Sequence, residues 1–299
     1  MQVAVEGLAL WFISGKKLAA TVLVVGLQPL VSFAAFESDE WGAHSAAMGG
    51  AFSAHVGTAE GSWFNPALAA SMQVKMFTST HVQLFTGVPE GLKRNLGGGV
   101  VPTKYGGFTL GLTQFGENGY KERVFEMGFA RELHDRFSLG FQMGNQGWEF
   151  EKWKRSDWSV SIGGIYEVGW ITPHTYARIG MVAEGLGRNL RSEGRLTGHR
   201  PSSYVVAFEI RPEQQIFAIE LEKTRNEWEL RAGCETPLVG DWALRFGGNV
   251  LFADSLNRTA SVGLGYDWDS IRFDYAYTYS YDLSSFGATH RIGIGLFGS

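Results

Sequence analysis

The residues best placed to do chemistry in this sequence are charged side chains that recur at every second position within apolar segments. Side chains two residues apart point to the same face of a β-strand, so each such segment has a charged face and an apolar face. Acidic and basic groups on neighbouring strands can form cross-strand ion pairs. We expect such a network on the inner face of the sheet, made by Glu209, Arg211, Glu220, Glu222, Glu229, Arg231, Arg245, Arg272, Asp274 and Arg291.

Sequence motifs for enzymatic chemistry are lacking. The chain has no G-x-S-x-G nucleophile elbow and no H-E-x-x-H zinc motif. Its seven histidines are scattered, and His44 and His55 have no neighbouring cysteine or carboxylate pattern that suggests a metal. Cys234 is the single cysteine, so no disulfide can form within the chain. We therefore expect a protein that is not an enzyme, with no catalytic residue, no cofactor and no metal site.

The composition narrows the fold class. The 299 residues include 40 Gly, 10 Trp, 10 Tyr and 21 Phe, but 8 Pro. Glycine and aromatic residues in such numbers are typical of strands joined by tight turns and bordered by aromatic girdles. The mean hydropathy of −0.07 fits a barrel, because its apolar and polar faces cancel in the average. A net charge of −4 without a clustered basic face argues against nucleic-acid binding.

The first 35 residues are predicted to be a signal peptide that is removed from the mature protein. Lys16 and Lys17 precede an apolar run over residues 18–31, which is shorter than the roughly 20 residues that cross a membrane as a helix. Ala34 and Ala35 then offer a small-residue cleavage site. The alternative interpretation is an uncleaved N-terminal anchor.

Alternation of apolar and polar residues dominates the rest of the chain. It is clear in residues 242–252 and again in residues 271–279. A soluble β-sandwich shows the same period, but its strands average about 5–6 residues. The segments here approach or exceed the roughly 9–11 residues that a tilted strand needs to cross a bilayer, and aromatic residues mark their ends. We therefore predict an all-β, transmembrane antiparallel β-barrel.

Fourteen segments are predicted as strands, an even number, as closed bacterial barrels usually require. They are residues 74–85, 94–101, 105–116, 120–131, 136–148, 157–169, 175–186, 202–211, 215–223, 226–236, 241–251, 258–267, 271–280 and 288–297. The connections include a short class, at 102–104, 134–135, 212–214 and 268–270, and a longer class, at 86–93, 149–156, 187–201 and 281–287. These classes fit short periplasmic turns and longer outer loops.

The segment that precedes the predicted barrel carries two motifs. Residues 42–54 fit G-A-x-x-x-x-M-G-G-A-F-x-A, and residues 63–69 read W-F-N-P-A-L-A. Together they resemble the start of the FadL/PorV/PorQ superfamily of outer-membrane proteins, and residues 273–277 with 289–296 are similar to that family's last hairpin. The resemblance spans nearly the whole mature chain. This sequence departs from the family at Leu68, where a glycine is usual, and it lacks a terminal aromatic residue.

The resemblance implies that residues 36–73 fold inside the lumen as a hatch and that residues 74–299 form the barrel of about fourteen strands. A lumen of this size cannot be filled by wall side chains alone. Gly49 and Gly50 permit a tight turn with positive φ, and Pro66 restricts Asn65 to extended backbone. The alternative is a periplasmic lead-in followed by an ordinary first strand.

Two functions remain as hypotheses. The first is passive transport of small hydrophobic molecules across the bacterial outer membrane. In that case the hatch supplies the gate and the ligand surface, through Met48, Gly49, Gly50, Phe52, Trp63, Phe64, Asn65 and Pro66. The charged inner face argues against a simple extension to long-chain fatty acids, since apolar ligands prefer mostly apolar pockets. The second is a PorV/PorQ-like accessory role in protein secretion or surface attachment. Expected partners are outer-membrane lipids, with a small hydrophobic ligand or a secretion-system component, and no nucleic acid.

Overall fold

The computed structural model describes residues 42–88, 92–116, 119–151, 153–186, 202–225, 227–253 and 257–298. The predicted signal peptide, the first residues of the predicted hatch (36–41) and the predicted loop 187–201 lie outside the described residues. Contacts group residues 38–195 and 201–299 into one compact unit, and the fold is that of this unit.

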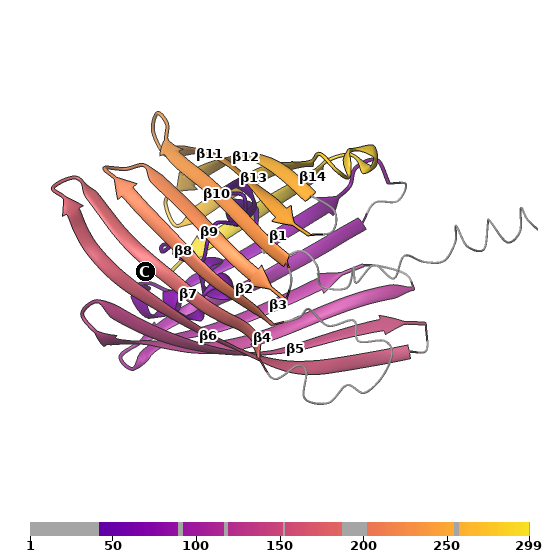
Figure 1. Ribbon diagram of the computed structural model, residues 1–299, viewed down its shortest axis with the longest axis horizontal. Coiled ribbons are helices and arrows are strands. Elements are labelled where there is room, and N and C mark those ends of the chain that lie inside the picture. Colours follow the sequence, from indigo (N-terminus) through magenta and orange to yellow (C-terminus); the bar gives the residue numbers. More distant parts are fainter. Residues whose placement is uncertain are drawn as a thin grey trace, which may run out of the picture. The chain divides into compact units, whose positions relative to one another are not determined.

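Fourteen strands form a closed antiparallel barrel (Figure 1). They are β1 (Met76–Leu84), β2 (Leu92–Thr103), β3 (Gly106–Phe115), β4 (Tyr120–His134), β5 (Phe137–Phe150), β6 (Trp153–Thr172), β7 (Thr175–Leu186), β8 (Ser203–Pro212), β9 (Ile216–Thr224), β10 (Glu227–Pro237), β11 (Trp242–Phe252), β12 (Asn257–Trp268), β13 (Ile271–Ser280) and β14 (Thr289–Phe297). Each strand pairs with the next in sequence, and β14 pairs with β1. The predicted barrel is confirmed.

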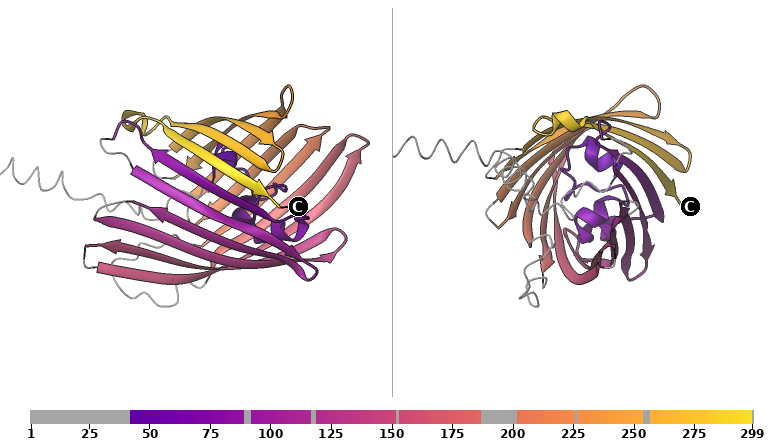
Figure 2. Two further views of the ribbon diagram at one scale, coloured as in Figure 1. Left: turned by 180° about the vertical axis from the view of Figure 1, so that it is seen from behind. Right: turned by 90° about the vertical axis from the view of Figure 1, so that its right-hand side faces the viewer.

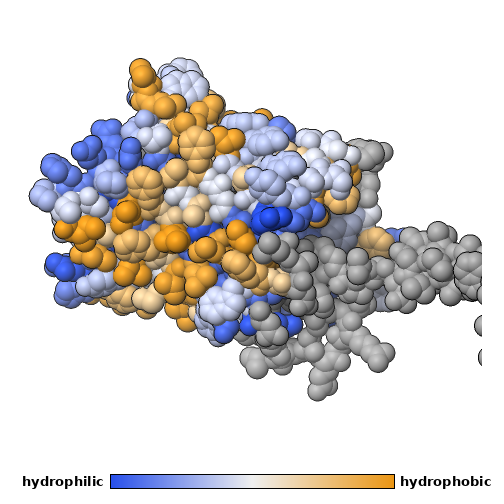
Figure 3. Space-filling view, turned by 45° about the horizontal axis from the view of Figure 1, so that its top comes forward, coloured by the Kyte–Doolittle hydropathy of each residue, from blue (hydrophilic) through white to orange (hydrophobic). Residues whose placement is uncertain are grey.

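The two faces of each strand differ in polarity as the alternation predicted. On β9, the inward Glu220 and Glu222 are buried, whereas the outward Ile219 and Leu221 are 48% and 41% exposed. Figure 3 shows hydrophobic side chains over the middle of one side of the barrel, with hydrophilic ones concentrated toward one end. An apolar outer band on strands of this length is the surface of a transmembrane barrel.

The two ends of the barrel carry different connections. The connections after the even-numbered strands up to β12 define the short-turn end, and those after the odd-numbered strands define the loop end. The prediction of a loop at 149–156 is wrong, because β5 continues to Phe150 and β6 begins at Trp153. Glu149 pairs with Lys154 in this extended hairpin. Aromatic and charged residues alternate there because they lie on opposite faces of the strands. Their charge had suggested a loop.

The segment before β1 lies inside the barrel. It contains the short α-helices α3 (Ala43–Ala47) and α4 (Gly61–Phe64) and the 3-10 helix η1 (Pro66–Ser71). Helix α3 contacts β11 to β14, and η1 contacts β2 to β6. The end-on view of Figure 2 shows these helices enclosed by the strands. We call residues 42–75 the hatch. Another 3-10 helix, η3 (Ser284–Phe286), lies between β13 and β14.

Within the described part of the chain, no helix combines the length and apolar character needed to span a membrane.

The outward face supplies a test of the membrane assignment. We expect Ile219→Lys, in the middle of β9, to lower the free energy of unfolding by about 2–4 kcal/mol, the cost of a cation near the bilayer midplane. Thr236→Lys, on the outward face near the end of β10, should cost about 0–1 kcal/mol. Urea unfolding in lipid vesicles, followed by heat-modifiable gel migration, measures both. Equal costs at the two positions would contradict the assignment.

Candidate functional site

The inner wall is made of glycine where the hatch runs along it. At each of these positions an added Cβ would lie less than 3.0 Å from a hatch atom: Gly98, Gly107, Gly111, Gly140, Gly163, Gly180, Gly233, Gly247 and Gly263. Glycine weakens a strand, and it is expected where another backbone approaches closely. We call this set the glycine wall. It lets the hatch lie directly against the strands, without a layer of side chains between them.

The turn after α3 shows how close this approach is. Gly49 and Gly50 have φ of 65° and 79°, so the predicted turn with positive φ is present. A Cβ on Gly247 would lie 2.2 Å from the Gly49 nitrogen, and one on Gly233 would lie 2.2 Å from the Met48 carbonyl oxygen. The turn therefore needs glycine on both sides of the contact.

Asn65 joins separate parts of the hatch to the wall. Its backbone is extended, as the following Pro66 predicted, with φ of −142° and ψ of 108°. Its side-chain oxygen accepts a hydrogen bond from the Ala67 N–H, and its amide nitrogen donates to the carbonyls of Ser53 and Gly164. The residue is fully buried, and its bonds to Ala67 and Ser53 are shielded from water.

The apolar hatch residues pack against each other and the wall. Met48, Phe52 and Phe64 form a buried cluster with Ile216 and Ala218 of β9. The Phe52 and Phe64 ring centroids are 5.5 Å apart. Trp63 is 5% exposed and lies against Gly98 and Gly111 of the glycine wall. These predicted site residues are thus brought together as the packed interior of the hatch, and their role toward a ligand stays a prediction.

Glu220 holds the centre of the hatch. One carboxylate oxygen accepts hydrogen bonds from the backbone N–H groups of Phe52 and Ser53, at 3.1 and 2.9 Å. The other oxygen lies 2.8 Å from Arg231 Nη1. Arg231 also contacts Glu222 and Glu229. A buried carboxylate is stable here because each oxygen has a hydrogen-bond donor.

His55 connects the hatch to a second group of charges. Its Nδ1 lies 2.8 Å from one oxygen of Glu209, whose other oxygen contacts both Arg178 and Arg211. Arg211 also donates a hydrogen bond to the Val56 carbonyl. Burial lowers the pKa of His55 below its ordinary value, which favours the neutral imidazole. A neutral ring can still donate its Nδ1–H to the carboxylate.

His44 lies at a third group of charges. Its Nε2 is 2.8 Å from an oxygen of Glu235, which also binds Arg245, and Arg245 in turn contacts Asp274. This contact does not have the geometry of a hydrogen bond. Burial, followed by the nearby Arg245, lowers the pKa of His44. The rings of His44 and His55 are 5.0 Å apart, so both histidines belong to one site.

All of the charged residues predicted for the inner face lie there. Two of them make other contacts: Arg272 pairs with Asp267 of the neighbouring strand, and Arg291 donates to the Thr278 hydroxyl. The contacts of the two histidines are not predictable from the sequence, because their partner carboxylates are more than 150 residues away in the chain. Arg178 and Glu235 were not predicted as members of the charge network, although alternation alone would have placed them on the same face.

Glu60 is the acidic group of the hatch itself. It is 3% exposed, and one oxygen accepts a hydrogen bond from the Ser45 N–H at 3.1 Å. Burial, together with the nearby negative charge of Asp274, raises the pKa of Glu60 from 4.5 to about 7. The backbone bond and Arg245 oppose this shift without cancelling it. Glu60 therefore carries a proton over much of the range below neutrality.

The residues that the structure describes contain no group of three or more His, Cys, Asp or Glu side chains arranged to hold a metal ion.

Comparison with known proteins gives the fold. No protein-family model matches the sequence, and no curated protein matches it. Among solved structures, the CymD monoaromatic hydrocarbon channel aligns with a TM-score of 0.60 at 13% identity, over 86% of this chain and 97% of its own. The toluene transporter TbuX of Ralstonia pickettii gives 0.57 at 12%, over 88% and 100%. A Pseudomonas aeruginosa FadL homologue gives 0.55 at 12%, over 86% and 97%. The predicted FadL resemblance is confirmed at the level of the fold.

The glycine wall can be tested with a matched pair on β5. A Cβ on Gly140 would lie 2.3 Å from hatch backbone atoms, whereas one on Gly144, on the same inner face, would meet only Glu126 and Ser159 at 3.3 Å or more. We expect Gly140→Ala to weaken hatch packing by about 1–3 kcal/mol, the usual cost of overpacking, and Gly144→Ala to have little effect. Hydrogen exchange of hatch amides measures this, with heat-modifiable migration as the control for barrel folding. Equal exchange in both variants would show that the close approach has no energetic role.

Glu60 predicts a pH dependence. Because the pKa of Glu60 is higher in the packed hatch than in the released one, protonation favours packing, and this contribution is lost as pH rises from about 4.5 to 7. The free energy of hatch opening should fall across this window by about 3 kcal/mol relative to Glu60→Gln, at about 1.4 kcal/mol per unit. His44 and His55, with lowered pKa values, titrate in the opposite sense. The difference between wild type and variant removes their contribution.

Exchange at the Ser45 amide, corrected for its intrinsic pH dependence, measures this difference. A difference that stays constant from pH 4.5 to 8 would rule out a proton on Glu60 in the packed hatch.

Proposed function

We propose that this chain is an outer-membrane protein that passively transports small hydrophobic molecules, with the hatch as its gate. Proteins with the same fold include a monoaromatic hydrocarbon channel and toluene transporters. These proteins resemble this chain in fold alone. Evidence for a hydrophobic ligand must therefore come from the inner surface of this chain.

An apolar cluster on the inner wall carries the proposal. Val82, Leu84 and Leu96 are buried together near the loop end, and Phe85 and Phe115 pack against them. Val82 and Leu96 face the lumen, since their strand neighbours Arg94 and Thr80 are inward-facing and buried. A solute that enters from the loops thus meets an apolar surface beside two cations, Arg94 and Arg291. A mostly apolar surface with a few polar groups is what a small hydrophobic ligand requires.

The cluster lies on the way to the hatch. On β2, Leu96 is two residues toward the loop end from Gly98, which lies against Trp63 of the hatch. At about 3.3 Å per residue, the cluster begins roughly 7 Å from this hatch contact. The cluster can therefore receive a ligand above the hatch while the hatch still closes the lumen.

The hatch can act as a gate because its attachment to the wall is noncovalent. The Glu220 carboxylate binds its backbone N–H groups at Phe52 and Ser53, and the glycine wall adds van der Waals contact. In this proposal, the residues Met48, Gly49, Gly50, Phe52, Trp63, Phe64, Asn65 and Pro66 form the moving part. The wall around them is charged. A small molecule needs few apolar contacts to pass it, whereas a long apolar chain would need a continuous apolar surface.

One observation favours an alternative. The hatch is tightly packed, and three groups of buried charges lie around it. A barrel whose hatch never opens would fit a PorV/PorQ-like accessory protein for secretion or surface attachment. Such a protein binds its partner through its loops and needs no path through the barrel. Transport activity separates the two functions.

Uptake of radiolabelled toluene by a Gram-negative host that lacks its own hydrocarbon channels tests the proposal. Expression of this chain should raise the uptake rate, and Val82→Asn should lower the gain by roughly tenfold, because a polar group replaces a buried valine in the apolar cluster. Val205→Asn is the matched control, since Val205 faces the lumen beside Glu222, away from that cluster. Uptake equal to that of cells with an empty vector would reject transport and favour the accessory role.

A further inference from the structure

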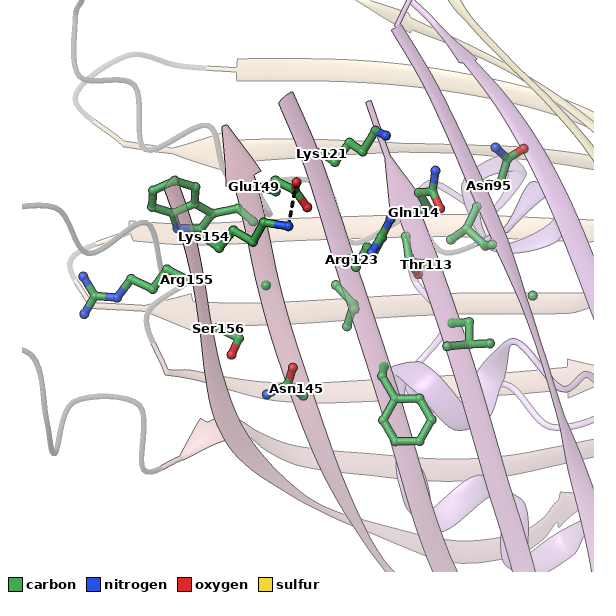
Figure 4. A pocket seen from close by; sticks show the side chains of 17 residues that line it. Asn95, Thr113, Gln114, Lys121, Arg123, Asn145, Glu149, Lys154, Arg155 and Ser156 are labelled. Carbon is green, nitrogen blue, oxygen red and sulfur yellow. Dashed lines mark ion pairs between the residues drawn. The ribbon is translucent and has the colours of Figure 1, made fainter. Parts of the chain in front are cut away.

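A cavity of about 740 Å³ lies in the wall near the loop end of β2 to β6 (Figure 4). It takes no part in the contacts between hatch and wall. Polar residues that line it include Asn95, Gln114, Lys121, Arg123, Asn145, Glu149, Lys154 and Ser156. We call it the outer-wall cavity.

The strand register places these polar groups on the outward face. Gln114 lies opposite Arg123, and Lys121 lies opposite Glu149. Residues directly opposite in antiparallel strands share a face. The next outward residues on β3 and β4 are Leu112, which is 54% exposed, and Phe125. The polar groups therefore project from the same surface as the apolar outer band, with the lumen on the other side of the wall.

The cavity carries excess positive charge. Lys121, Arg123, Lys154 and Arg155 line it together with a single carboxylate, that of Glu149. Lys154 Nζ lies 2.9 Å from Glu149 Oε1, which leaves the positive charge of Lys121 and Arg123 without a balancing acidic group in the lining. Guanidinium and ammonium groups with nearby amide N–H donors are the usual set that recognises a phosphate group.

The cavity lies where the outer band changes from apolar to polar. On β3 the change falls between Leu112 and Gln114, and on β4 between Phe125 and Arg123. On β6, Trp158 is 52% exposed, and Ser156 follows it on the same face toward the loop end. Tryptophan at such a boundary marks the headgroup level of a membrane. A phosphate at this level belongs to a lipid.

We propose that the outer-wall cavity binds the phosphorylated headgroup of a membrane lipid in the leaflet nearest the loops. Lys121 and Arg123 contact the phosphate, and the amides of Asn95, Gln114 and Asn145 contact its oxygens and polar substituents. The acyl chains run along Leu112 and Phe125 toward the membrane centre. A free phosphate would make no use of these two apolar side chains, whereas an amphiphile contacts both parts of the cavity.

The test compares two double variants that remove the same charge. Lys121→Gln with Arg123→Gln removes the cations of the cavity. Lys223→Gln with Arg225→Gln removes two cations near the loop end of β9, outside the cavity. The full-length protein is reconstituted in phosphatidylcholine vesicles that contain 5 mol% of a bis-phosphorylated lipid A, extracted in mild detergent, and analysed for retained lipid A by native mass spectrometry.

We expect wild type and the β9 variant to retain lipid A equally. The cavity variant should retain roughly 25-fold less, at about fivefold for each cation near a membrane surface. An equal loss of retained lipid A in the two double variants would show that surface charge in general causes the effect. That result would overturn the proposal. Displacement of the lipid by inorganic phosphate at millimolar concentration would instead identify a site for a free anion. Lys121→Gln alone, a change of one half-exposed side chain, keeps the test valid if the double variant fails to fold.

Discussion

Direct contact between two backbones, that of the hatch and that of the barrel wall, is the constraint on which the rest of the structure depends. A fourteen-strand barrel encloses more space than its own side chains fill, and an open lumen would leave the hatch with few contacts. At the glycine wall, the absence of side chains lets the hatch reach the strand backbone and contact it directly. Each glycine weakens its strand, but the barrel tolerates this because strand pairing on both sides holds its backbone.

The charges of the inner wall follow from the same constraint. A segment with only short helices has backbone N–H groups without partners, and these need acceptors when buried. The wall supplies them as carboxylates: Glu220 binds two hatch amides, while Arg231 compensates its charge from the next strand. The histidines reach Glu209 and Glu235 in a similar way. The inner charges therefore hold the hatch in place more than they attract a solute.

Alternation made the barrel predictable, and distance in the sequence limited the prediction of the site. A period of two is a local property, so the strands and the inward position of residues such as Arg245 and Asp274 follow from neighbours alone. The contact of His55 with Glu209 depends on how the hatch folds back into the closed barrel, which no local pattern encodes. The hairpin of β5 and β6 was misjudged for another reason: its charged residues suggested a loop, although Glu149 and Lys154 are cross-strand partners.

The same alternation lets one strand serve two surfaces that can change independently. On β4, Glu122 and Val124 face the lumen, while Arg123 and Phe125 face the membrane. Neighbours in sequence thus contact different media, and a substitution at one position leaves the opposite face largely intact. The transport path and the lipid contact that we propose are therefore separable by mutation, although they share a wall one strand thick. Folding stability is what links them, since both faces depend on the same register of hydrogen bonds.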